Sequence, residues 1–177
     1  MSKVKMTKVM YEAYLAEEQD ILRGIKDATE RRNDAVKEGD LSENASFTKA
    51  KEDLATLKLR KSKITEILNN VEVISASTSN VLDCGSYIRV TKCDKKYNEL
   101  RDSELFILDS MERYLCGFIG ITSTLGKKIY GKPRGVFAVN VNGQTLYYKV
   151  DKLQPTPEVE DEFRNTYPVT MDGIFDV

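Results

Sequence analysis

FTKAKEDLATLKLRKSKITEILNNV, residues 47–71, carries a helical repeat of apolar side chains. The repeat advances in alternating steps of three and four residues, and only Lys61 among its positions is not apolar: Phe47, Ala50, Leu54, Leu57, Lys61, Ile64, Leu68 and Val71. This spacing keeps one stripe of a helix turned toward a partner helix over more than three heptads. The stretch therefore predicts one helix of a coiled coil.

The preceding segment, residues 8–38, predicts the partner helix. It lacks proline, and Gly24 is its only glycine. Several apolar residues fall near heptad positions with charges between them: Leu15, Leu22, Ile25 and Val36. A tight Gly-Asp turn at residues 39–40 joins the two segments, which favours an antiparallel hairpin. At ~1.5 Å per residue, roughly thirty residues make a rod of about 45 Å.

Beyond the hairpin, the pattern changes to short β-branched and aromatic runs bounded by turn residues. The runs are residues 86–90, 104–108, 116–121, 135–141 and 145–150. Asn142-Gly143 is a strong signal for a two-residue β-hairpin turn, and STLGKKIY, residues 123–130, predicts a short helix. We therefore expect a small antiparallel β domain with one helix.

The fold class is α+β, and the sequence divides into four parts. We expect a coiled-coil hairpin over residues 1–74 with its tip at 38–46, and a polar linker, SASTSN, at 75–80. The β domain follows at 81–153. Residues 154–177 form an acidic tail with three of the four prolines, which we expect to be partly extended and inert.

Composition excludes several classes of function. The chain has 177 residues and no histidine, which removes serine-histidine triads, cysteine-histidine pairs and histidine-based zinc sites. Three cysteines without CxxC spacing indicate unpaired thiols in a reducing cytoplasm. We expect a cytoplasmic protein, because no apolar run is long enough for a membrane span and no signal peptide is evident.

The charge distribution argues against a protein that binds nucleic acid without a partner protein. The net charge is −1, from 27 basic and 28 acidic residues. Even residues 75–153, the most basic part, hold twelve basic residues against eight acidic ones. Affinity for free nucleic acid should therefore be weak and sensitive to salt.

The loop KEGDLSENAS, residues 37–46, allows two interpretations of the roles of Asp40 and Glu43. They fit a capping box for the second helix, with Ser42 as a competing cap and Gly39 ending the first helix. They could also bind a divalent ion, but Mg²⁺ prefers about six oxygen ligands and this pair supplies two. A metal role would need another macromolecule to hold the rest of the shell.

Two motifs resemble the Gre family of transcript cleavage factors of bacterial RNA polymerase. EGDLSENASFTKAKE, residues 38–52, resembles the family's tip motif. GITSTLGKKIYGK, residues 120–132, resembles a stretch of its C-terminal domain and is followed by the expected strand, Asn-Gly turn and strand. The resemblance covers about residues 6–153 in order, and it implies an FKBP-like C-terminal domain.

The resemblance implies an activator of the polymerase rather than an enzyme. In the family, the hairpin enters the secondary channel of RNA polymerase, and the tip carboxylates, here Asp40 and Glu43, help to hold a second Mg²⁺ beside the polymerase's own metal. The chain alone would bind no metal. The polymerase then cleaves backtracked RNA, so the implied partners are RNA polymerase, the nascent RNA 3′ end and DNA within the elongation complex. We expect the factor to be a monomer.

Further site residues follow from the same motifs. Near the tip, contacts to polymerase or RNA are implied for Asn44, Phe47 and Lys51. In the C-terminal domain, docking to the polymerase is implied for Ser123, Leu125 and Gly126.

Departures from the family pattern leave alternatives open. Ser46 replaces the usual Glu, and Phe47 replaces Tyr and loses its hydroxyl, while Thr124 replaces Pro. Retention of both tip acids favours cleavage activation. The alternatives are a channel-binding regulator that modulates or inhibits the polymerase without cleavage, and a coiled-coil interaction protein whose tip is merely capped. An autonomous hydrolase is the weakest interpretation.

Overall fold

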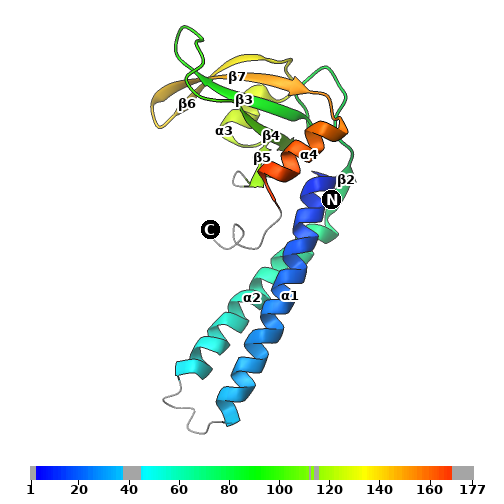
Figure 1. Ribbon diagram of the computed structural model, residues 1–177, viewed down its shortest axis with the longest axis vertical. Helices are drawn as coiled ribbons and strands as arrows, with labels where there is room; N and C mark the ends of the chain where they lie inside the picture. Colours follow the sequence, from blue (N-terminus) through cyan, green and yellow to red (C-terminus); the bar gives the residue numbers. More distant parts are fainter. Residues whose placement is uncertain (1–2, 38–44, 112, 114–115, 169–177) are drawn as a thin grey trace. The chain divides into compact units, whose positions relative to one another are not determined.

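The computed structural model describes residues 3–37, 45–111, 113 and 116–168 (Figure 1). The chain divides into two compact units. The first, the hairpin unit, is Glu12–Asn70, and the second, the β unit, joins Met1–Tyr11 to Val71–Val177. The hairpin unit is thus shorter at both ends than the expected segment of residues 1–74, because residues 1–11 and 71–74 belong with the β unit.

Two long helices confirm the predicted hairpin. Helix α1 spans Lys8–Lys37 and helix α2 spans Ala45–Asn69, running side by side in opposite directions (Figure 1). The repeat read from α2 is confirmed where Ala50, Leu54 and Ile64 are buried. Its last position, Val71, has left the helix and lies in a strand.

Three of the four apolar residues expected to form the seam of α1 do not form it, and the fourth, Ile25, is half-buried. Leu15, Leu22 and Val36 are 38%, 38% and 48% exposed, respectively. Each follows by one residue a buried position, and those positions are Tyr14, Ile21 and Ala35. The true seam of α1 uses small and polar residues as well as large apolar ones: Ala13, Tyr14, Glu17, Asp20, Ile21, Ala28 and Ala35.

A close approach between the helices explains why small residues face α2. A Cβ atom built on Gly24 would lie 3.2 Å from Cδ1 of Leu57. The leucine side chain therefore fills the space above the glycine, and interior packing leaves little room for a larger residue there. A search for large apolar residues alone misses such a position.

The β unit is built on a five-stranded sheet with the order β5-β4-β3-β7-β6 (Figure 1). Neighbouring strands are antiparallel except for the parallel pair β4 and β5. The strands are β3 Tyr87–Cys93, β4 Glu104–Asp109, β5 Phe118–Gly120, β6 Gly135–Val141 and β7 Gln144–Leu153. Asn142 and Gly143 have φ angles of 51° and 80°, as the predicted two-residue turn requires.

One face of this sheet packs on the predicted helix. Helix α3 spans Thr124–Ile129 and contributes Ile129 to the core. The buried core residues are Leu82, Ile88, Val90, Phe106, Leu108, Ile119, Ile129 and Val150. The α+β fold class is confirmed by this unit together with the hairpin.

The acidic tail contains a helix where an extended segment was expected. Helix α4 spans Pro157–Thr166, and its Phe163 is 2% exposed. The Phe163 ring lies 5.9 Å from the Tyr87 ring and 5.5 Å from the Phe118 ring, both edge to face. Arg89 donates two hydrogen bonds to the Glu162 carboxylate, at 2.8 and 2.6 Å. One apolar residue and one ion pair thus dock a helix whose other residues are mostly polar.

A small parallel ladder precedes the sheet. Strand β1, Val4–Thr7, pairs with β2, Val71–Ile74. The Thr7 N–H donates to the buried Asp109 carboxylate at 2.9 Å, and the Thr7 hydroxyl accepts from the Met10 N–H at 3.3 Å. Burial raises the pKa of the Asp109 carboxyl, and the hydrogen bonds from Thr7 oppose that rise.

The expected linker, residues 75–80, is bonded to the β unit. The Lys152 ammonium donates to the hydroxyls of Ser77 and Ser79 at 3.0 and 3.1 Å. The Ser77 N–H donates to the Gly85 carbonyl at 2.9 Å. Serine hydroxyls therefore hold this segment in place, although its composition is that of a flexible connection.

Candidate functional site

The tip residues predicted to act in catalysis, Asp40 and Glu43, lie outside the described residues, as does Asn44. The helix end that precedes them is described. Lys37, the last residue of α1, donates from its ammonium to the Asp34 carboxylate at 2.8 Å. This hydrogen bond and the charge of Asp34 raise the pKa of Lys37. A positive charge therefore closes α1 directly before the loop, where it also complements the helix dipole.

The two predicted contact residues that follow the tip have different environments. Phe47 is half-buried in the first turn of α2, three residues before the buried Ala50. This position supports packing along the hairpin seam. Lys51 is exposed on the next turn, so its ammonium is available to a partner.

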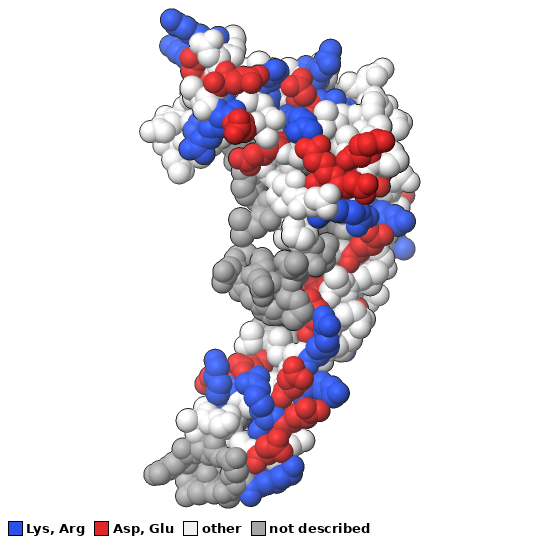
Figure 2. All heavy atoms as spheres, in the orientation of Figure 1, with Lys and Arg blue, Asp and Glu red and all other residues white. Residues whose placement is uncertain are grey.

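Charges on the hairpin surface pair across the two helices. Asp53 on α2 accepts a hydrogen bond from Arg31 of α1 at 3.1 Å and lies 3.4 Å from the Lys49 ammonium. Figure 2 shows basic and acidic side chains interspersed along these helices. The hairpin therefore presents a mixed surface rather than a continuous basic track of the kind that binds nucleic acid.

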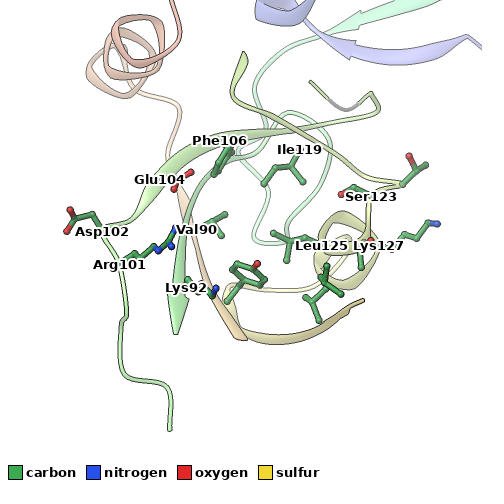
Figure 3. Close-up of a pocket in the computed structure, with 15 residues that line it drawn as sticks. Val90, Lys92, Arg101, Asp102, Glu104, Phe106, Ile119, Ser123, Leu125 and Lys127 are labelled. Atoms are coloured by element: carbon green, nitrogen blue, oxygen red, sulfur yellow. The ribbon is translucent and has the colours of Figure 1, made fainter. Parts of the chain in front are cut away.

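The β unit contains a pocket of about 490 Å³ beside α3 (Figure 3). Its size is within the range of sites that accept a small ligand or a few side chains. Apolar side chains in the lining are Val90, Phe106, Ile119, Leu125, Val139, Val141 and Tyr148. Charged side chains in the lining are Lys92, Arg101, Asp102, Glu104 and Lys127.

Two of the three predicted docking residues line this pocket. Ser123 is the N-cap of α3, and its hydroxyl accepts the Gly126 N–H at 3.0 Å. This cap satisfies a backbone donor at the helix start. Leu125 is half-buried, packs against the core and faces the pocket (Figure 3).

The third, Gly126, is buried in α3 and is not among the residues that line the pocket. A Cβ atom at this position would lie 1.9 Å from the Gly120 carbonyl oxygen. Only glycine therefore lets α3 approach the end of β5 so closely. Gly126 supports the pocket by placing Ser123 and Leu125, and it does not contribute to the lining.

The charged rim of the pocket was not identified from the sequence. Lys92 comes from β3, while Arg101 and Asp102 come from the loop before β4. Pairing of β3 with β4 brings these segments together. The alternation within β3, which puts Val90 and Lys92 on one face, is the local signal that could have indicated Lys92.

Two further observations concern metal ligands and membrane-spanning helices. Within the described residues, no three Cys, Asp or Glu side chains gather as potential metal ligands. The same residues include no helix that is both long and apolar enough to cross a membrane.

Comparison with known proteins places the chain among transcription factors. Residues 4–73 match a family model described as "Transcription elongation factor, N-terminal". "Transcription elongation factor GreA" of Lachnoclostridium phytofermentans is 31% identical over 133 residues, which cover 73% of this chain and 81% of the relative. The protein of the same name from Ureaplasma urealyticum is 34% identical over 125 residues, covering 69% and 77%. Among solved structures, GreA factor homolog 1 of Thermus thermophilus matches 86% of this chain and 99% of its own, with 18% identity and a TM-score of 0.41.

Proposed function

Because the chain belongs to the Gre family of transcription elongation factors, we propose that it binds RNA polymerase and stimulates the polymerase's own cleavage of backtracked nascent RNA. The observation that carries this proposal is the pair Asp40 and Glu43, which lie in the sequence between the two helices of an antiparallel hairpin.

The hairpin is long and narrow enough to enter a channel. Helix α1 has 30 residues, which at ~1.5 Å per residue corresponds to about 45 Å. Its close packing at Gly24 and Leu57 keeps the pair of helices narrow. These features support entry of the hairpin into the secondary channel of RNA polymerase, toward the nascent RNA 3′ end and the DNA held in the elongation complex.

Asp40 and Glu43 are the residues that would hold Mg²⁺. Carboxylate oxygens are ligands that this hard cation prefers, but the pair supplies only about two of its roughly six ligands. The metal would therefore be shared with the polymerase, and its chemistry would be to activate water for attack on a phosphodiester. The chain itself would act as an activator and not as a nuclease.

The tip has neighbours that could position it against RNA or polymerase. Lys51 is exposed, and its ammonium can donate a hydrogen bond to a phosphate oxygen of RNA. Asn44 adjoins Glu43 in the sequence and is proposed as a further contact. The half-buried Phe47 would orient the start of α2 through packing.

The pocket beside α3 is the proposed docking site of the β unit. Leu125 gives it an apolar wall, and Ser123 holds the start of α3 through its cap. We assign to this pocket an apolar side chain of the polymerase, with the charged rim setting orientation. Docking there would leave the hairpin unit to deliver the tip.

A second candidate function is modulation of the polymerase without cleavage. The replacements at Ser46 and Phe47 favour it, because they change the residues that follow the tip acids. In this case the factor would occupy the channel and leave RNA intact. A coiled-coil protein with a merely capped tip is the third possibility, and it predicts no effect on RNA.

A transcript cleavage assay on stalled, backtracked elongation complexes with Mg²⁺ tests the proposal. We compare the unchanged protein with Asp40→Asn, which can still cap a helix but is a poor ligand for a hard cation. Asp27→Asn, an exposed position on α1, is the matched control, and circular dichroism checks each fold.

The proposal expects RNA shortening with the unchanged protein and with Asp27→Asn, and none with folded Asp40→Asn. Binding of the unchanged protein without shortening would assign the modulator function instead. Full stimulation by Asp40→Asn would contradict the metal role of the tip.

A further inference from the structure

Strand β6, Gly135–Val141, lies at the end of the sheet (Figure 1). It pairs with β7 along its whole length, and among the described residues no strand pairs with its other side. An edge strand presents backbone N–H and C=O groups that another chain can pair with.

The register identifies the outward-facing backbone groups of β6. Val141 and Gln144 close the two-residue turn, so they form a hydrogen-bonded pair with β7. Hydrogen-bonded and non-hydrogen-bonded pairs then alternate along an antiparallel ladder. Val136, Ala138 and Asn140 fall in the non-hydrogen-bonded pairs and direct their N–H and C=O groups outward. All three residues are exposed.

This edge lacks the usual protection against strand addition. Proteins commonly place lysine, proline, a bulge or a very short strand at a sheet edge. The seven residues of β6, GVFAVNV, include no charge and no proline, and its register with β7 is continuous. The opposite edge differs, because β5 has three residues and Phe118 bridges to Arg113.

The sequence around β6 is basic. From residue 113 to residue 150 the sequence has no Asp or Glu, and it has six basic residues: Arg113, Lys127, Lys128, Lys132, Arg134 and Lys149. Lys132 and Arg134 directly precede β6 and are exposed. Lys149 lies opposite Val136 on β7, where its charge is met by Glu99 at 2.9 Å. The charges at the start of β6 have no acidic neighbour in this stretch of sequence.

We propose that the outer edge of β6 binds an extended acidic segment of a partner protein, which adds as a sixth strand. Backbone hydrogen bonds to Val136, Ala138 and Asn140 would supply affinity. Lys132 and Arg134 would select acidic side chains over basic ones. This proposal goes beyond the proposed function and does not depend on it.

A partner segment fits the charges better than a second copy of this chain. A second β6 would bring its own Lys132 and Arg134 and no acidic residue to the pairing. An acidic strand instead meets these cations with opposite charge. The side chains of Val139 and Val141 line the pocket beside α3, so every second side chain of an added strand would lie on that side of the sheet.

Fluorescence anisotropy with a labelled ten-residue peptide that alternates Glu and Val tests the proposal. A peptide with Lys in place of Glu is the charge control. Ala138→Pro removes one outward N–H while keeping the ladder to β7, since proline is tolerated on the open side of an edge strand. Ala138→Val is the matched control, because it keeps the N–H and favours a strand.

The Glu-Val peptide should bind the unchanged protein and Ala138→Val. Binding to Ala138→Pro should weaken about tenfold through a lost hydrogen bond and a clash with the added strand. Replacing Lys132 and Arg134 with Gln should weaken it too, and raising the salt concentration should do the same. RNA cleavage should be unchanged in Ala138→Pro, which separates this proposal from the proposed function.

Three results would overturn the proposal. These are equal binding of the Glu and Lys peptides, equal binding by the two Ala138 variants, and no binding to the unchanged protein. If sedimentation shows that the unchanged protein is a dimer and Ala138→Pro is a monomer, the edge instead binds a second copy of this chain, which also contradicts the proposal. If Ala138→Pro does not fold, a Glu-Val peptide methylated on alternate backbone amides replaces it, and undiminished binding of that peptide contradicts strand addition.

Discussion

The Arg60 guanidinium donates a hydrogen bond to the Glu17 carboxylate at 2.6 Å, from α2 to α1 of the hairpin unit. Glu17 is 1% exposed, whereas the Arg60 side chain is 43% exposed. The pair therefore joins a buried charge to a partner that water can reach. A polar pair with one buried member can set the register between two helices, and Thr65 of α2 donates a further hydrogen bond to Glu18 of α1 at 3.1 Å.

Removing one partner of this pair should destabilise the hairpin. Arg60→Ala leaves the Glu17 carboxylate buried without that donor, and we expect a loss of about 2 kcal/mol, less than for a fully enclosed pair because Arg60 is partly solvated. The measurement is the free energy of unfolding in urea. Arg31→Ala breaks the exposed pair with Asp53 and is the control, with an expected loss of about 0.5 kcal/mol. Equal losses would mean that burial of Glu17 has no energetic consequence.

Gly126 should not tolerate a methyl group. In Gly126→Ala the new Cβ meets the Gly120 carbonyl oxygen, so α3 must shift, at a cost of about 3 kcal/mol. Gly143→Ala is the matched control, because a Cβ there meets nothing within 4 Å and only its positive φ opposes the change, by about 1 kcal/mol. Thermal unfolding followed by circular dichroism compares the two. A smaller effect at residue 126 than at residue 143 would contradict the close approach of α3 to β5.

Helix α4 should contribute to the stability of the β unit. Phe163→Ala removes a ring that contacts Tyr87 and Phe118, and we expect a loss of about 3 kcal/mol. Asp161→Ala, an exposed change on the same helix, should cost less than about 0.5 kcal/mol. Calorimetric unfolding measures both variants. If Phe163→Ala has the same stability as the unchanged protein, the docking of α4 does not stabilise the β unit.

Acid should weaken the segment before β3 through Asp83. Partial burial raises the pKa of the Asp83 carboxyl, but hydrogen bonds from Ser77, Ser86, Ser79 and Lys152 outweigh it and lower the pKa from 3.8 to about 2. A carboxyl whose pKa is depressed in the folded state stabilises the protein above its unfolded pKa, and this contribution is lost as the pH falls through the folded pKa. The loss should therefore occur between about pH 4 and pH 2.

The pH prediction is measured as a difference between two proteins. Asp83→Asn should remove a pH-dependent contribution of about 1 kcal/mol, after allowance for solvent screening of this partly exposed group. Urea unfolding of both proteins at several pH values gives the difference in stability. That difference should be constant above pH 4 and should shrink below it. A difference that is flat down to pH 2 would show that the folded state does not depress this pKa.

Local patterns were enough for much of the fold. The three- and four-residue steps through Ala50, Leu54 and Ile64 predicted α2 and its buried face, because a helix brings such positions to one side whatever it packs against. The Asn142-Gly143 turn followed from the positive φ angles that these residues accept. Ser123 and Leu125 were reached through a motif, and both prove to line the pocket.

Other features could not be read locally, since they depend on what faces a residue in space. The seam of α1 includes Gly24 because the Leu57 side chain of α2 fills the space above it. Helix α4 could not be predicted from composition, since a single Phe163 among charged residues is buried only by its contacts with the Tyr87 and Phe118 rings of the sheet. Lys92 and Arg101 became pocket residues through strand pairing.

The sequence by itself determined the two helices and the Asn142-Gly143 turn, because spacing, backbone preference and residue type are properties of neighbouring positions. Only the tertiary structure decided which α1 residues are buried, where the tail docks, which charges border the pocket and which strand is left at the edge. Those outcomes depend on contacts between residues far apart in the chain, and burial there follows from the shape and charge of the opposing surface.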